Sequence, residues 1–333
     1  MKFLYKYPQE AFPYEQLYRE SRSRTKSDRE FELADTGVFD GEKYFDVCVE
    51  YAKAGPEDIC IRITAANRGP DAAPLHILPS VWFRNTWSWA EKTPKGRIGI
   101  DGSALSIEKD SHCNYRLHFD GGPDTLFCEN ETDNQALFNS ANASGFVKDG
   151  IGRFIVEGNE AAVDRENLGS KAALHYRFDL APGESAEILL RLADAPAAKV
   201  QDLNETCRTI FDLRLREADE FYAGVVPPNL SADGKSVMRQ ALAGLLWSKQ
   251  YYNYAVKQWL DGDPACPPPP GERLRGRNHD WKHLFNDDVI SMPDKWEYPW
   301  YAAWDLAFHC IPLALVDPTF AKRQLILLLR EWY

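Results

Sequence analysis

The chain contains 333 residues, of which 44% are hydrophobic and 27% are charged, a composition typical of soluble globular proteins with one large domain or two smaller ones. Its net charge of −11 argues against a surface that binds nucleic acid or anionic membranes. Aromatic residues reach 13%, an excess that fits a large core, a carbohydrate-binding groove, or both.

Targeting signals and membrane spans are not expected. The chain has no run of about 18 apolar residues that could form a span, and the stretch from Met1 to Pro8 lacks the sustained apolar region of a secretory signal. The seven cysteines are scattered without CxxC spacing, as expected for reduced thiols. We therefore expect a cytoplasmic protein that contacts neither nucleic acid nor membrane. The sequence leaves its oligomeric state open.

The first 202 residues predict a large antiparallel β-sandwich. Residues 1 to about 43 form a polar entry, rich in loops, with one short helix. Beyond it, apolar and polar residues alternate in many short segments that are separated by turns, without helices between them. Pro79 places its segment at a sheet edge or at a bulge. The expected strands are Tyr44–Tyr51, Asp58–Ala66, Leu75–Phe83, Ser103–Lys109, Tyr115–Phe119, Thr125–Cys128, Phe154–Glu157, Ala173–Leu180 and Ser185–Leu192.

From residue 203 the pattern becomes helical. Residues 203–229 predict a linker helix and a domain boundary, and Ser231 is a plausible N-cap for a long helix that reaches Trp259. A polar loop is expected at Arg273–Asn286. Two helices should follow, Tyr301–Val316 and Phe320–Trp332. The second has no C-cap signal, so we expect the natural polypeptide to continue.

The most distinctive stretch runs from Met292 to His309. It is crowded with tryptophan, tyrosine and phenylalanine, and Asp305 is the carboxylate on its otherwise apolar predicted helix. Flat aromatic faces suit the C–H faces of a sugar ring, and apolar crowding favours a protonated carboxyl group. Both properties fit an acid that cleaves sugars. A plain alternative stays open, in which this is a buried core helix whose aspartate caps a neighbour or pairs with an arginine.

Other chemistry has little support in the sequence. His279 and His283 have the i, i+4 spacing of metal ligands, but no Cys or His stands at ligand spacing to complete a zinc site. The nucleotide-binding motifs GxGxxG and GxxxxGK[ST] and the serine-hydrolase motif GxSxG do not occur. We therefore expect no metal and no cofactor.

Three segments, Asn85–Trp89, Gly244–Tyr252 and Asp294–Phe308, resemble glycoside hydrolase family 63. The resemblance implies a β-supersandwich over residues 1–202 and a six-hairpin (α/α)6 toroid that begins at residue 230. It also implies an inverting, α-glucosidase-like hydrolase of glucosylated oligosaccharides or small glucosides. Only the first helices of the toroid would lie within residues 230–333.

The resemblance also gives the expected site. It makes Asp305 the general acid, whereas the family's general base is a later glutamate that no position of this chain matches. Helical spacing adds two expectations: Tyr301 shares a face with Asp305 at i, i+4 and should line the sugar site, and Trp304 should lie in the core, stacked with Phe308 at i, i+4. The other expected contacts to the carbohydrate substrate are Tyr252, Asp294, Lys295, Trp296 and Trp300.

An inverting glycosidase holds its two carboxyl groups about 6.5–9.5 Å apart, one to protonate the leaving oxygen and one to activate water. Desolvation by Trp300, Tyr301 and Trp304 should favour the protonated acid more than the helix dipole opposes it. Two further interpretations remain. The chain could be a carbohydrate-binding sandwich without catalysis, or a purely structural module.

Overall fold

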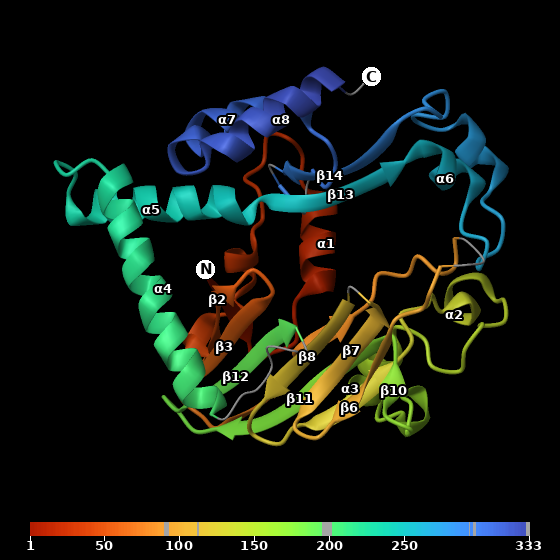
Figure 1. Ribbon diagram of the computed structural model, residues 1–333, viewed down its shortest axis with the longest axis horizontal. Helices are drawn as coiled ribbons and strands as arrows, with labels where there is room; N and C mark the ends of the chain where they lie inside the picture. Colours follow the sequence, from red (N-terminus) through yellow and green to blue (C-terminus); the bar gives the residue numbers. More distant parts are fainter. Residues whose placement is uncertain (90–92, 112, 195–201, 293, 296–297, 331–333) are drawn as a thin grey trace. The chain divides into compact units, whose positions relative to one another are not determined.

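A computed structural model describes residues 1–89, 93–111, 113–194, 202–292, 294–295 and 298–330 (Figure 1). The chain divides into two compact units. The first contains the eight-stranded and four-stranded sheets and ends at Arg214, whereas the second starts at Leu215, within helix α4, and also takes in Asn134–Ser140. The mixed β and α structure with antiparallel sheets confirms the expectation of a β-rich multidomain fold in its coarse form.

The larger sheet has eight strands, each antiparallel to its neighbours. The alternating sequence pattern explains the strands, because residues at every second position from Ile63 through Ala65 to Asn67 are buried. In spatial order the strands are β1 (Lys2–Pro8), β2 (Tyr44–Gly55), β3 (Asp58–Asn67), β12 (Ser185–Asp194), β8 (Cys113–Phe119), β7 (Ala104–Asp110), β6 (Arg97–Asp101) and β10 (Leu168–Gly169).

The smaller sheet is built around β11 (Lys171–Leu180), which pairs with β4 (Ala73–Ile77), β5 (Ser80–Trp82) and β9 (Asp124–Cys128). Pro79 divides the strand expected at Leu75–Phe83 into β4 and β5, since proline cannot donate to a ladder. Its carbonyl instead accepts from the amide of Leu174 at 2.9 Å.

One hydrophobic core joins the two sheets. Ile98, Leu105 and Leu190 from the larger sheet contact Phe127 and Leu174 from the smaller one, and all five are at most 2% exposed. Burying each such side chain stabilises the fold by about 1.5–3 kcal/mol. The first unit is therefore a two-layer arrangement of antiparallel sheets.

Two sequence predictions in the first unit were wrong. Strand β1 lies in the entry that was expected to be loop and one short helix, and it pairs with β2 along its whole length. The helix α1 (Tyr14–Ser23) does occur. The strand expected at Phe154–Glu157 is the end of a helix, α3 (Gly150–Glu157).

Helix α3 shows why a short apolar run is ambiguous. Ile151, Phe154 and Ile155 follow the i, i+3, i+4 spacing of a helix face and pack on one buried cluster. Gly158 then ends the helix with a positive φ of 66°, and its amide donates to the carbonyl of Arg153. The contacts of these three side chains with residues of β9 and β11 favour a helix over a strand for this segment.

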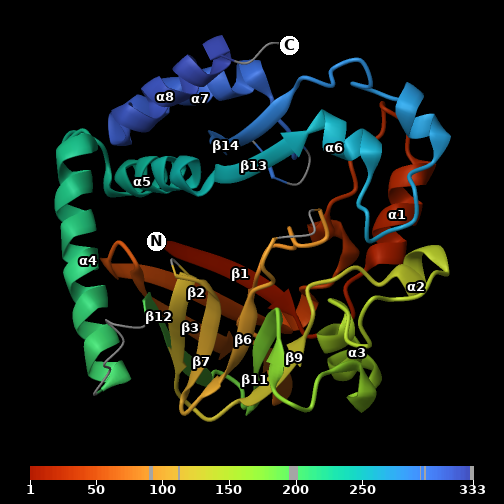
Figure 2. The same ribbon diagram turned by 45° about the vertical axis from the view of Figure 1, so that its right-hand side comes forward.

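The second unit mixes helices with a two-stranded antiparallel sheet (Figure 2). Within the described part of the chain, every helix is too short or too polar to cross a bilayer. Helix α4 (Leu203–Val225) spans the division between the units. The other elements of the second unit are α2 (Asn134–Phe138), α5 (Ala232–Trp247), β13 (Lys249–Ala255), α6 (Val256–Asp261), β14 (Phe285–Ser291), α7 (Ala303–Val316) and α8 (Pro318–Arg330).

The long helix expected from Ser231 to Trp259 is interrupted. Ser231 is the N-cap as predicted, and its hydroxyl accepts from the amide of Gly234, but α5 ends at Trp247. Residues Lys249–Ala255 form β13, which pairs antiparallel with β14. The tyrosine-rich run has high strand propensity, and a partner strand distant in the sequence satisfies it. The loop expected at Arg273–Asn286 is shorter than predicted, because β14, a strand that the sequence did not predict, begins at Phe285.

The core of the second unit forms around the end of β14. Ile290 and Met292 pack against Leu306, Cys310 and Leu313 of α7, with Ala321 and Leu327 of α8 and with the C-terminal end of α5. Figure 1 shows α7 and α8 running side by side. Four elements thus meet where β14 ends.

The Gln324 side chain ties α8 to the end of β14. Its Oε1 accepts from the Ser291 amide at 3.1 Å and its Nε2 donates to the Val289 carbonyl at 3.1 Å. Gln324 is 2% exposed, so neither bond can be replaced readily by water. The amide side chain takes the place of a neighbouring strand for these two backbone groups.

Replacing Gln324 by leucine should lower the free energy of unfolding by about 1–3 kcal/mol, because the buried Ser291 amide would lose its acceptor. Denaturant titration followed by circular dichroism measures the change. The matched control is Gln240→Leu on the exposed face of α5, which should stay within about 0.5 kcal/mol. Equal effects of the two substitutions would contradict a structural role for Gln324.

Candidate functional site

Asp305 lies in the first turn of α7 and is half-buried. The helix forms because Leu306, Cys310 and Leu313 recur at helical spacing and are all buried. A helix turns by about 100° per residue, so Asp305 lies on the flank of this buried stripe. His309, one turn further along, lies on the same flank. The carboxyl group is thus at the border between core and surface.

Aromatic rings are exposed on both sides of Asp305. Trp304 and Phe308 are 71% and 60% exposed, and their ring centroids lie 5.7 Å apart in an edge-to-face arrangement. Just before the helix, Tyr298 and Trp300 are 48% and 47% exposed with centroids 5.5 Å apart. The segment therefore presents two pairs of rings to solvent.

Trp304 does contact Phe308, but edge to face and not stacked, and the prediction that Trp304 lies in the core was wrong. Both residues are two positions away from Leu306, which places them about 200° from the buried stripe. The buried side of α7 is instead filled by aliphatic and thiol side chains. The rings are left on the outer face.

Tyr301 and Tyr252 come together at the start of α7. Their rings are nearly parallel, 28° apart, with centroids separated by 6.4 Å, and both pack on the core of the second unit. Burial raises the pKa of the Tyr252 phenol, although the backbone amide of Tyr301 hydrogen-bonds to it. Tyr252 is therefore a neutral hydroxyl at physiological pH. The sugar-contacting roles of both tyrosines stay predictions.

The other expected binding residues lie before α7. Asp294 is half-buried and Lys295 is exposed, in the segment after β14. Trp296 lies outside the described residues. Of the residues predicted to bind sugar, Tyr252 and Tyr301 thus contact each other. Trp300, also predicted, contacts Tyr298, which was not.

A partly buried chain of hydrogen-bonding side chains starts at His309, one helical turn after Asp305. His309 Nδ1 is 2.9 Å from Ser291 Oγ, which is 3.2 Å from Ser248 Oγ. Ser248 Oγ donates to the Leu245 carbonyl at 2.6 Å. Three elements supply this chain: the C-terminal end of α5, β14 and α7. Only one sign of this arrangement was present in the sequence, the i, i+4 spacing of Asp305 and His309. Ser248 and Ser291 are distant from each other in the sequence, so their contact could not be foreseen.

Ser291, His309 and Asp305 are the residue types of a serine-hydrolase triad, but their arrangement does not make a nucleophile. Ser291 is completely buried, at 0% exposure. A nucleophilic serine must reach a substrate carbonyl. The hydrogen bonds among Ser248, Ser291 and His309 therefore support α7 from within the protein.

Burial lowers the pKa of His309, and the charge of Asp305 opposes this to a smaller degree. The neutral imidazole is thus the favoured form at pH 7. The negative charge of Asp305 is the charge that raises the pKa of the His309 ring. The ring's hydrogen-bond partner is the uncharged Ser291, which in turn bonds to the uncharged side chains of Ser248 and Gln324.

The described residues contain no cluster of three His, Cys, Asp or Glu side chains that could hold a metal ion. His279 instead contacts the Gly276 carbonyl and Asp280.

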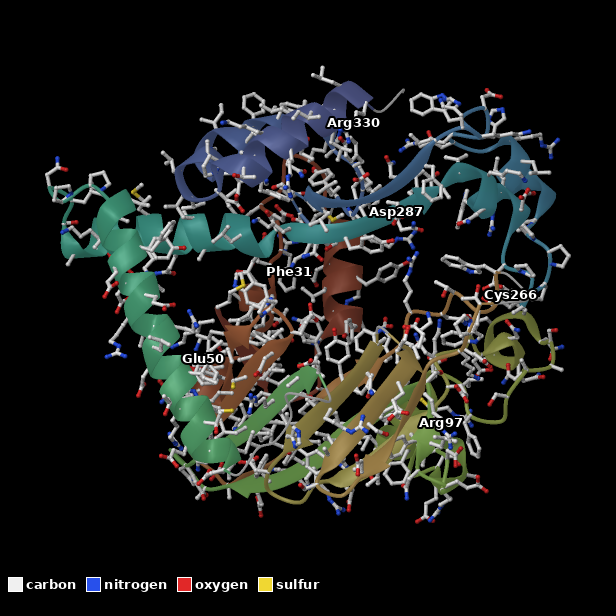
Figure 3. All side chains as sticks on the ribbon, viewed as in Figure 1. Phe31, Glu50, Arg97, Cys266, Asp287 and Arg330 are labelled. Atoms are coloured by element: carbon white, nitrogen blue, oxygen red, sulfur yellow. The ribbon has the colours of Figure 1, made fainter. Side chains whose placement is uncertain are left out.

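Each unit also has a surface cavity whose lining does not include Asp305. In the first unit a polar cavity of about 520 Å³ is lined by Arg97, Ser106, Glu108 and Asn167, among others. In the second, a cavity of about 490 Å³ is lined by residues of β13, β14 and α8, including Arg330. Figure 3 shows Arg97 on β6 and Arg330 on α8.

Comparisons with known proteins identify one sequence relative and no family. No family model matches the chain. Uncharacterized protein YMR196W of Saccharomyces cerevisiae is 39% identical over the whole of this chain, which spans 35% of the length of that relative. A polysaccharide lyase of known structure aligns with 45% of this chain and 20% of its own, at 14% identity and a TM-score of 0.28.

The lowered pKa of His309 predicts a pH dependence of stability. An unfolded histidine titrates near pH 6.5, so below that pH the unfolded chain binds a proton more readily than the folded chain does. The free energy of unfolding should therefore fall as pH drops from about 7 to about 5, and fall less in His309→Gln. Urea titrations at several pH values give the slope of the free energy of unfolding against pH for the wild type and for His309→Gln. The contributions of His118 and His175, whose pKa values are also lowered, cancel in this comparison because both proteins contain them. Identical slopes would contradict the prediction.

Proposed function

We propose that this chain is the part of an inverting, α-glucosidase-like glycoside hydrolase that carries the general acid, Asp305. The observation that supports the proposal best is the half-buried carboxyl group at the start of α7 with exposed aromatic pairs on either side. Exposed rings can stack on sugar C–H faces, and partial burial gives a carboxyl group access to both solvent and a leaving oxygen.

In the proposed reaction, Asp305 donates its proton to the glycosidic oxygen as the bond to the anomeric carbon breaks. A second carboxylate, the glutamate expected beyond these residues, removes a proton from the water that attacks the opposite face. Trp300 and Tyr301 would hold the sugar beside Asp305. Tyr252 would support Tyr301 through their ring contact.

The finer architecture belongs to the same proposal. Residues 1–202 would be a β-supersandwich, residues 203–229 a linker, and residues 230–333 the first part of an (α/α)6 toroid. The cytoplasm is the proposed location, and the reduced thiols of Cys60, Cys128 and Cys207 in buried positions are consistent with it.

A second candidate is a carbohydrate-binding sandwich without catalysis. The polar cavity of the first unit favours it, since Arg97, Ser106, Glu108 and Asn167 offer donors and acceptors for sugar hydroxyls. Its lining includes no aromatic ring, which makes it a weaker platform for a sugar than the α7 segment. Titration with glucose, followed by tryptophan fluorescence, separates sugar binding from a purely structural role.

Replacing Asp305 by asparagine should reduce kcat on α-glucosides at least about a hundredfold while fold and sugar binding persist, since only the transferable proton is lost. The measurement uses the product of the complete open reading frame and a glucoside with a poor leaving group. Asp261→Asn, at an exposed acidic residue of α6, is the matched control and should keep full turnover. A near-normal kcat in Asp305→Asn would remove this residue from the mechanism.

Residues 1–333 alone should release no glucose from α-glucosides, because the expected general base is not among them. Leu325, Ile326 and Leu329 are 46%, 48% and 84% exposed, so association is also expected. Glucose assays and light scattering on the purified chain test both statements. A monodisperse monomer that hydrolyses glucosides with inversion would require a base within this chain.

A further inference from the structure

Two histidines contact each other in the smaller sheet of the first unit. His175 Nε2 of β11 lies 3.2 Å from His76 Nδ1 of β4, and the ring centroids are 4.9 Å apart. In the register of the two strands His76 lies opposite Arg177, so it shares a sheet face with His175, two residues earlier. His175 is 5% exposed, whereas His76 is exposed. These two residues, the histidine pair, thus join a buried ring to a ring at the surface.

The second ring nitrogen of the buried histidine limits what the pair can bind. His175 Nδ1 is buried and has no hydrogen-bond partner within the part of the chain that the structure describes. A hydrogen on this nitrogen would be a buried donor without an acceptor, an arrangement that native proteins avoid. The neutral pair escapes this cost when His175 carries its hydrogen on Nε2 and donates it to His76 Nδ1.

Protonation of either ring removes that escape. If His76 gains a proton, both of its nitrogens carry hydrogens, so His175 Nε2 must accept and its own hydrogen moves to Nδ1. If His175 gains the proton, Nδ1 again carries a hydrogen. If both rings are protonated, neither can accept from the other. Every protonated form that keeps the contact therefore places a hydrogen on the unpartnered nitrogen.

The charges around His175 do not compensate for a proton. Burial lowers the pKa of His175, and His76 from β4 and Arg177 from β11 lower it further. Asp124 from β9 acts in the opposite direction, but its carboxylate already forms an ion pair with Arg177 at 2.6 Å. Helix α3, which packs on the neighbouring Ala173, contributes apolar side chains. Acid therefore acts against the contact between the two rings.

We propose that the histidine pair is an acid-sensitive contact that holds strand β4 on β11 at neutral pH and releases it in acid. Strand β4 lies at the edge of the smaller sheet, next to β11. Its inward residues Ala73 and Leu75 are 8% and 3% exposed, in a hydrophobic cluster that includes residues of β2 and β3. Release of β4 would therefore expose apolar side chains that lie between the two sheets at neutral pH.

The direction of the pH dependence follows from proton binding. A histidine in a released strand titrates near pH 6.5, so below about that pH the released form binds protons that the paired form excludes. The equilibrium constant for release should rise by up to about tenfold per pH unit for each proton taken up. Above about pH 6.5 both forms are neutral, and the contact is kept.

The test is amide hydrogen exchange of the 333-residue chain, followed by mass spectrometry between about pH 5 and about pH 7.5. Rates are corrected for the intrinsic pH dependence of exchange, and a chelator keeps metal ions from joining the two rings. In the wild type, protection of β4 should fall by up to about tenfold per pH unit below about pH 6.5. Strand β12, in the middle of the larger sheet, should keep its protection over the same range.

His76→Gln is the first variant, because His76 is exposed and a glutamine carbonyl is an acceptor that acid does not remove. It should flatten the pH dependence of β4 protection, and His76→Gln combined with His175→Gln should abolish it. His118→Gln, at a histidine of β8 whose pKa is also lowered, is the matched control and should leave the pH dependence of β4 as in the wild type.

Two results would overturn the proposal. One is an unchanged pH dependence of β4 protection in the double variant. The other is an equal loss of protection in β4 and β12, which would mean that acid unfolds the first unit as a whole. Neither readout involves turnover, so both decide the proposal independently of any glycosidase activity.

Discussion

The end of β14 at Ser291 is the point on which the second unit depends. The Ser291 amide is bonded to Gln324 of α8, and its hydroxyl lies between Ser248 at the end of α5 and His309 of α7. Ser291 is wholly buried, so each of these bonds replaces a lost bond to water. If one partner is removed, a polar group remains buried without compensation. The position of α7, and with it that of Asp305, is set by these bonds together with the hydrophobic core around Leu306.

Hydrogen-bonded polar side chains in a core carry a desolvation cost that aliphatic side chains avoid. In return, their hydrogen bonds define the geometry of the groups that they join. Leucine and cysteine side chains on the buried stripe of α7 hold the helix against the end of β14 but would tolerate small rotations. Hydrogen bonds from His309 to Ser291 and onward to Ser248 have preferred lengths and directions, and so fix the rotation of α7. The carboxyl group on the adjoining flank of the helix is oriented as a consequence.

The outer face of α7 has the opposite character. Trp304 and Phe308 lie on it, largely in water, a few residues from the buried chain. Contiguous exposed apolar surface commonly marks places where a ligand or another surface binds. The combination of a rigid inner face and an aromatic outer face, with Asp305 between them, is the physical basis of the proposed sugar site.

The sequence by itself determined the alternating strands of the first unit and the position of Asp305 on a helix with aromatic neighbours, because strand and helix periods and residue types are local properties. It also determined the Trp304–Phe308 pair, which follows from i, i+4 spacing alone. Only the tertiary structure decided that Lys249–Ala255 is a strand and that Phe154–Glu157 belongs to a helix. Their partners are distant in the chain, and packing against those partners overrides local preference. The bonds among Ser248, Ser291 and His309 are of the same kind, since no local pattern states which hydroxyl will lie under which ring.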